Sequence, residues 1–212
     1  MPNHALQRTG SAVTAPVADH RHLSTRRQEP RPLRLSQSLA SLDAQAMPRR
    51  IDQNGIPDPL SREVIECFLK VGVPYRLAML DFAEAAIPAK TTRDSAFVEA
   101  GIVTGRLLLQ FLGLGVRRKG GLTLIASREY HTENGFTDEV KITDLGGRFV
   151  EVASLDAETA DALAHYHNGA SKASAHFTWD SGHQLKPDNL RRCLPIIRNL
   201  VLTHLPSHAN GA

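Results

Sequence analysis

The stretch FVEAGIVTGRLLLQFLGL, residues 97–114, decides the fold of this chain. Apolar or small residues recur in it at alternating intervals of three and four, namely Phe97, Ala100, Thr104, Leu107, Phe111 and Leu114. The stretch ADALAHYHNGASKASAHF, residues 160–177, repeats the interval with Ala160, Leu163, His167, Ala170, Ser174 and Phe177. That spacing places each set on one face of a helix. We therefore predict two long helices that pack along these faces at the centre of a bundle.

Small residues suggest that the two helices approach closely. Gly101 and Gly105 lie one turn apart inside the first helix, where each costs about 1 kcal/mol relative to alanine. The second helix is rich in glycine, alanine and serine over residues 169–175. We expect the two small-residue surfaces to face one another, because a close contact would compensate for the glycines.

Further helices are predicted before and after this pair. Residues 60–71 and 77–87 have apolar helical faces, and Gly72 with Pro74 should separate them. Thr91 and Asp94 have the spacing of a capping box for the helix that contains residues 97–114, and Asp156 should cap the helix over about 157–177. A last helix should bury Leu190, Leu194, Ile197, Val201 and Leu205, with Asp188 as its cap and Pro195 as a kink or as its true start.

Strand-forming residues lie between the two long helices. Residues 122–130 and 136–145 flank Asn134-Gly135, a strong hairpin signal, and a third short strand is predicted at 149–152. The predicted fold class is therefore mainly α, a four- to five-helix bundle with a β-hairpin inserted at about 122–152.

Charge divides the 212 residues into a tail and a core. Residues 1–50 carry eight arginines against three acidic residues, whereas the remainder carries 17 basic and 19 acidic side chains. The core therefore lacks the overall charge typical of polyanion binding, although a local basic patch stays open. We expect a disordered basic tail at 1–47, a helical domain at 50–205 and a disordered end at 206–212, because the tail has four prolines and no aromatic residue.

The sequence contains no motif for membrane insertion, secretion, or metal or cofactor binding. The sequence has no apolar run of about 18 residues and no secretory signal, so we expect a cytoplasmic protein that does not enter the membrane. Cys67 and Cys193 stand alone, which indicates buried thiols, and His165 with His167 lie too close along a helix to chelate one ion. No nucleotide-loop or cofactor motif occurs, and the sequence predicts neither a cofactor nor a metal.

The candidate site lies beside the predicted helix seam. If the flanks of the two helices face one another, Arg106, Lys172 and His176 converge as a cationic cluster with a titratable imidazole, which suits phosphate binding and proton transfer. A structural interpretation competes with this one. Glu99 could pair with a cation across the bundle, and His176 could donate to a backbone carbonyl at the end of its helix.

Three segments carry a resemblance to a known group of proteins. They are FVEAGIVTGRLLLQFL at 97–112, TDEV at 137–140 and SKASAHFT at 171–178. Together they resemble an uncharacterised family of small bacterial helical proteins that is similar to HEPN-type domains, although Leu107 and Ser171 stand where that pattern has asparagine. The resemblance implies an RNA- or nucleotide-directed domain of a defence or toxin system, such as a metal-independent ribonuclease.

Two more resemblances concern the ends of the chain. Arg198-Asn199 followed by His204 resembles the Arg-polar-spacer-His pattern of HEPN ribonucleases, which implies that Arg198 holds the scissile phosphate and His204 acts as acid or base at a dimer interface. Residues 1–40 resemble a peptide translated from an intergenic repeat in otherwise unrelated bacterial reading frames, which implies that Met47 is the initiator.

Two classes of function stay open. The first is the RNA- or nucleotide-directed enzyme or binding domain. The second is a non-enzymatic helical module that binds a protein partner or a second copy of itself, which the near-neutral core favours.

Overall fold

The computed structural model describes residues 48–175 and 185–206, so the predictions for residues 1–47 and for the end of the chain after residue 206 lie outside the described residues. The described part is mainly helical, with two small two-stranded sheets.

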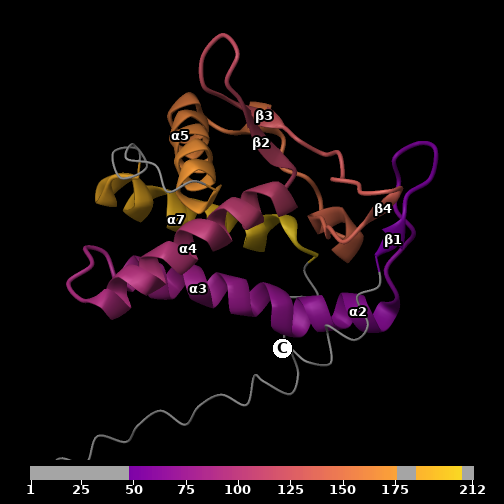
Figure 1. Ribbon diagram of the computed structural model, residues 1–212, viewed down its shortest axis with the longest axis horizontal. Coiled ribbons are helices and arrows are strands. Elements are labelled where there is room, and N and C mark those ends of the chain that lie inside the picture. The colour runs from indigo at the N-terminus through magenta and orange to yellow at the C-terminus, as the bar shows by residue number, and fades with distance from the viewer. Residues whose placement is uncertain (1–47, 176–184, 207–212) are drawn as a thin grey trace, which may run out of the picture. The chain divides into compact units, whose positions relative to one another are not determined.

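The first helical segment is continuous where the sequence predicts a break. Helix α2 (Arg62–Cys67), the π turn η1 (Phe68–Gly72) and helix α3 (Val73–Ala85) form one rod in Figure 1. The prediction that Gly72 and Pro74 separate two helices is therefore wrong. The wide π turn precedes Pro74, which then falls in the first turn of α3, where its missing N–H is tolerated.

Helix α4 (Thr92–Phe111) begins as the sequence predicts. The Thr91 hydroxyl accepts a hydrogen bond from the Asp94 N–H at 3.1 Å, and the Asp94 carboxylate accepts one from the Thr91 N–H at 3.0 Å. This confirms the capping box, which satisfies two N–H groups that the first turn leaves without helical partners.

The buried face of α4 differs from the predicted one. Its buried residues are Gly101, Thr104, Gly105, Leu108 and Leu109. Leu107, predicted to be in the seam, is 39% exposed, and Leu114 lies beyond the helix in a strand. The glycines explain the shift.

A Cβ on Gly101 would overlap Ala83 of α3, and one on Gly105 would overlap the hydroxyl of Tyr166 on α5, so the two neighbouring helices contact α4 at these positions. Close approach of a neighbouring helix is therefore confirmed at Gly101, where that helix is α3. Gly105 instead accommodates the end of the Tyr166 side chain from α5, whose hydroxyl also donates to the Gly101 carbonyl oxygen at 3.2 Å, so the predicted contact of two small-residue surfaces is wrong at this position.

Helix α5 (Ala157–Ala175) is buried on most of its surface between residues 162 and 170. The Asp156 carboxylate accepts a hydrogen bond from the Thr159 N–H at 2.7 Å, as expected of its cap. Leu163, His167 and Ala170 of the predicted face are buried, whereas the side chains of residues 174 and 177 lie outside the described set. The helix is therefore a central element of the core.

Helix α7 (Pro187–His204) buries the predicted apolar residues Leu190, Leu194, Ile197 and Val201. Pro195 lies inside the helix rather than at its start, and Lys186 occupies the cap position that the sequence assigns to Asp188. Cys193 is buried here as a free thiol, and burial raises its pKa to about 12. Cys67 is a free thiol as well but only half-buried.

The sheets use different partners from those predicted. Strand β2 (Leu114–Arg117) pairs antiparallel with β3 (Thr123–Ala126), and β1 (Arg49–Arg50) pairs with β4 (Phe136–Thr137). The predicted turn at Asn134-Gly135 forms, with φ of 53° and 81°. The predicted pairing of 122–130 with 136–145 is wrong, because Gly113, at φ 76°, ends α4 and turns the chain directly into β2.

Two predicted strand regions contain 3-10 turns instead. The turn η2 spans Ile142–Leu145, and η3 spans Val152–Ser154. The β2–β3 hairpin packs against α5 and α4, as Figure 1 shows.

Candidate functional site

The predicted cationic cluster lies partly within the described residues. Arg106 on α4 and Lys172 on α5 are both half-buried, and both already interact with other groups of the chain. His176 lies outside the described residues, so the convergence of all three side chains stays a prediction.

The charge of Arg106 acts on a different histidine. His167 of α5 is only 7% exposed, and neither of its ring nitrogens has a hydrogen-bond partner among the described residues. Burial, together with smaller effects of the positive charges of Arg106 and Arg118, lowers its pKa to about 4. Arg118 comes from the turn between β2 and β3, so three separate elements bring two cations to one buried imidazole.

The chemistry of this group follows from its charge. With its lowered pKa the imidazole is neutral at pH 7, so one ring nitrogen donates a hydrogen bond and the other accepts one. A buried polar atom without a partner costs about 1–3 kcal/mol, and the positive charge of the two arginines favours an anion beside the imidazole. The imidazole of His167 and the two arginines are therefore suited to an anionic ligand whose oxygen atoms can donate or accept a hydrogen bond.

Sequence reasoning missed this arrangement because it assigned His167 to the packing face. One signal was present: Arg117, Arg118 and Lys119 precede Gly120-Gly121 and form a basic turn. Nothing in the sequence indicates that the β2–β3 hairpin, which carries this turn, packs against α5.

The two residues of the C-terminal pattern contact different neighbours. Arg198 Nε lies 3.1 Å from Asp81 Oδ1 on α3, whereas His204 Nδ1 lies 3.1 Å from the carbonyl oxygen of Arg148. Each side chain thus has a structural partner on a separate element, and within this chain the structure does not bring the two together.

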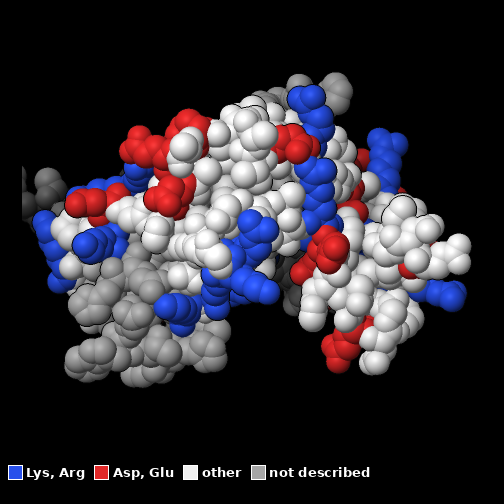
Figure 2. All heavy atoms as spheres, turned by 90° about the horizontal axis from the view of Figure 1, so that it is seen from above, with Lys and Arg blue, Asp and Glu red and all other residues white. Residues whose placement is uncertain are grey.

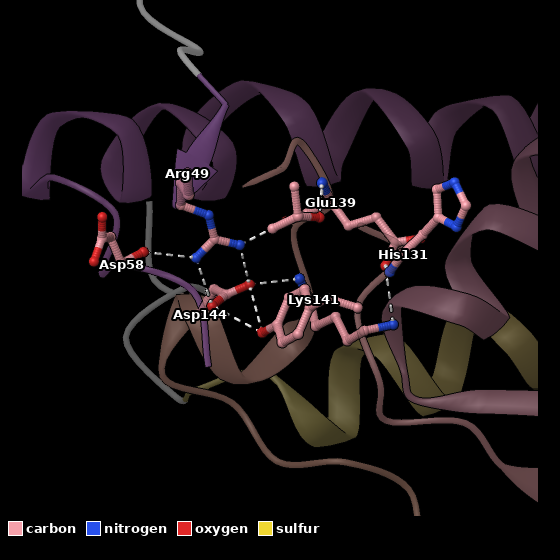
Figure 3. Close-up of polar contacts among 8 residues, drawn as sticks. Arg49, Asp58, His131, Glu139, Lys141 and Asp144 are labelled. Carbon is pink, nitrogen blue, oxygen red and sulfur yellow. Dashed lines mark hydrogen bonds and ion pairs between the residues drawn. The ribbon is translucent and has the colours of Figure 1, made fainter. Parts of the chain in front are cut away.

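A second polar cluster joins the start of the domain to residues 130–144. The guanidinium of Arg49, only 8% exposed, donates to both carboxylate oxygens of Asp144 at 3.0 Å and to the carbonyl oxygens of Asp58 and Glu139 (Figure 3). The Asp144 carboxylate also accepts from the Tyr130 hydroxyl at 3.0 and 3.1 Å.

The same cluster contains a second ion pair. Lys141 Nζ, also buried, lies 3.4 Å from Glu139 Oε2 and 5.3 Å from the centre of the Tyr130 ring. Figure 3 shows the imidazole of His131 pointing away from this cluster. Because the charges compensate each other, the cluster is a structural clamp rather than a reactive site. The sequence gives no signal for it, since Arg49 and Asp144 are 95 positions apart.

The surface carries both signs of charge. On the face drawn in Figure 2, basic and acidic side chains intermingle and neither sign covers the face continuously. Within residues 48–175 and 185–206, no group of three or more His, Cys, Asp or Glu side chains is arranged to hold a metal ion. None of the helices in this part of the chain combines the length and apolar character that a membrane crossing requires.

Comparison of the chain with protein-family models, curated proteins and solved structures found no match.

Proposed function

We propose that this chain is an RNA- or nucleotide-directed helical domain of HEPN type that holds a phosphate group at Arg106, Arg118 and His167. One observation carries the proposal: the imidazole of His167 is buried with no hydrogen-bond partner among the described residues, and the positive charges of Arg106 and Arg118, from different elements, act on it. A phosphate oxygen between them would supply both the negative charge and the missing hydrogen bond. The resemblance of residues 97–112 and 171–178 to the HEPN-like family supports the same class.

The roles follow from the chemistry of the three groups. Arg106 and Arg118 would bind phosphate oxygens through charge-assisted hydrogen bonds. The neutral imidazole of His167 would accept a proton, for instance from a ribose 2′-hydroxyl next to the phosphate. Negative charge of the bound phosphate raises the pKa of a nearby imidazole, which would make His167 a stronger base in the complex than in the free protein.

The test compares site variants with a charge-matched control. The full chain and its Arg106→Gln, Arg118→Gln and Arg62→Gln variants are titrated with a fluorescent single-stranded oligoribonucleotide and, separately, with ATP. Arg62 is exposed on α2 and its only ion pair in the described structure is with Glu66. Loss of one charge-assisted hydrogen bond, about 1.5–3 kcal/mol, weakens binding roughly 10- to 100-fold at either site arginine, whereas Arg62→Gln changes it little.

Cleavage is measured on the same samples with total RNA, adding His167→Gln, His176→Ala and His204→Ala. Loss of cleavage in His167→Gln alone assigns the proton acceptor. Equal affinity of the site variants and of Arg62→Gln for both ligands overturns the proposal.

A second function is supported by the apolar surface of α3 and α4. Phe82 is 51% exposed and Val103 is 40% exposed on these two packed helices, which suits self-association of a non-enzymatic module. Analytical ultracentrifugation, which measures the oligomeric state, compares the full chain with a Phe82→Glu, Val103→Lys double variant. A dimer that the variant abolishes, together with absence of RNA and nucleotide binding, would favour this second function.

A further inference from the structure

A cavity of about 330 Å³ lies between three segments of the domain, and it is separate from the residues of the proposed phosphate site. The π turn and start of α3 form one wall, the second half of α4 forms another, and residues 138–141 close the third side. Its volume is within the range of small-molecule sites, about 300–1,000 Å³.

The walls are largely apolar. Phe68, Leu107 and Phe111 line the cavity, and Leu107 is 39% exposed because this space lies beside it. A leucine of that exposure next to two phenylalanines offers apolar surface to a ligand.

Two of the charged residues that line the cavity, Glu139 and Lys141, neutralise each other. The Glu139 carboxylate accepts a hydrogen bond from the His131 N–H at 3.0 Å and lies 3.4 Å from Lys141 Nζ (Figure 3). Lys141 is 4% exposed, so this ion pair is fixed within the structural clamp and adds no net charge to the cavity.

A different cation also lines the cavity. Arg76 of α3 is half-buried, and within the described residues its guanidinium forms no ion pair and no side-chain hydrogen bond. Gln110 of α4 lines the same cavity and is half-buried too. Asp138 is exposed, where water can solvate its carboxylate.

We propose that this cavity binds a small molecule with an apolar body and a single carboxylate or similar monoanionic group. The guanidinium of Arg76 binds the anionic group, and the amide of Gln110 donates a hydrogen bond to it. The apolar body packs against Phe68, Leu107 and Phe111. The structural clamp holds residues 138–141 in place and so fixes the third wall.

The experiment uses three probes with the same phenyl body. The full chain is titrated by ligand-observed NMR with 3-phenylpropionate, 3-phenylpropanol and 3-phenylpropylamine. We expect the carboxylate to bind at least about tenfold more tightly than the alcohol, and the amine to bind most weakly, because the charge-assisted bond to Arg76 discriminates among them.

Variants then test the two walls separately. Arg76→Gln should reduce carboxylate binding about tenfold and leave alcohol binding unchanged, while Leu107→Trp should block both by filling the space. Arg62→Gln on α2 is the matched control and should bind like the parent. Thermal unfolding of each variant confirms that it is folded.

The proposal is overturned by equal binding of carboxylate and alcohol, by preference for the amine, or by an Arg76→Gln variant that binds like the parent. Absence of 3-phenylpropionate binding at millimolar concentration also overturns it. The phosphate-site variants do not alter these residues, so failure here is distinct from failure of the proposed RNA- or nucleotide-directed function.

Discussion

Replacing Arg49 with leucine should destabilise the domain by about 3–5 kcal/mol. The guanidinium is 8% exposed and donates four hydrogen bonds, two to Asp144 and one each to the carbonyl oxygens of Asp58 and Glu139. Its removal leaves the Asp144 carboxylate, whose side chain is 12% exposed, without its counter-charge. Removing one partner of a buried ion pair costs about this much, because the remaining charge cannot regain its hydration.

That loss is a large part of the total stability, which is about 5–15 kcal/mol for a folded domain. Urea denaturation of the full chain, followed by circular dichroism, measures it. Arg62→Leu breaks an ion pair whose arginine is 87% exposed, and it should cost at most about 1 kcal/mol.

A double-mutant cycle isolates the ion pair itself. Asp144→Asn keeps an acceptor for Tyr130 but removes the charge that Arg49 balances. The Arg49→Leu, Asp144→Asn double variant should therefore lose less than the sum of the two single losses, by about 1–3 kcal/mol. A loss in Arg49→Leu no larger than in Arg62→Leu, or strict additivity in the cycle, would refute the role of this buried pair.

Two further predictions concern α4 and α5. Because burial lowers the pKa of His167 to about 4, the folded chain should take up its proton later than the unfolded chain, and stability should fall by about 3 kcal/mol as the pH drops from 6.5 to 4. The free energy of unfolding, measured by urea titration at several pH values, should fall more steeply with decreasing pH for the parent than for His167→Phe. An equal pH dependence of the two would contradict the lowered pKa. Gly105→Ala should destabilise the domain by about 1–3 kcal/mol despite the better helix propensity of alanine, because the added methyl group overlaps the Tyr166 hydroxyl. Adding Tyr166→Phe to the same chain should recover part of this loss, as measured by thermal unfolding.

The buried face of α4 shows the limit of sequence periodicity. Residues 102–103 and 107–109 are all apolar, so several helical faces satisfy the same spacing. The choice depends on where side chains of neighbouring helices reach the backbone of α4, and this occurs at Gly101 and Gly105. Periodicity therefore predicted the helix but not its orientation.

The candidate site was predictable only in part. Arg106 could be found from its position beside a helix seam, since it is one residue from the predicted face. Arg118 and His167 could not be assigned to it, because the effect of Arg118 on His167 depends on the β2–β3 hairpin packing against α5. Arg76 and Gln110 share a cavity for a similar reason, as they come from two helices whose contact the sequence does not specify.

The sequence by itself determined the starts of α4 and α5 and one turn. Thr91 with Asp94, Asp156 and Asn134-Gly135 act on backbone groups within four residues, so their effect needs no distant partner. Tertiary structure alone decided the strand pairing, the clamp between Arg49 and Asp144 and the approach of two arginines to His167. These contacts join residues far apart in the chain, and their stability depends on exclusion of water, which arises only when the packed elements surround them.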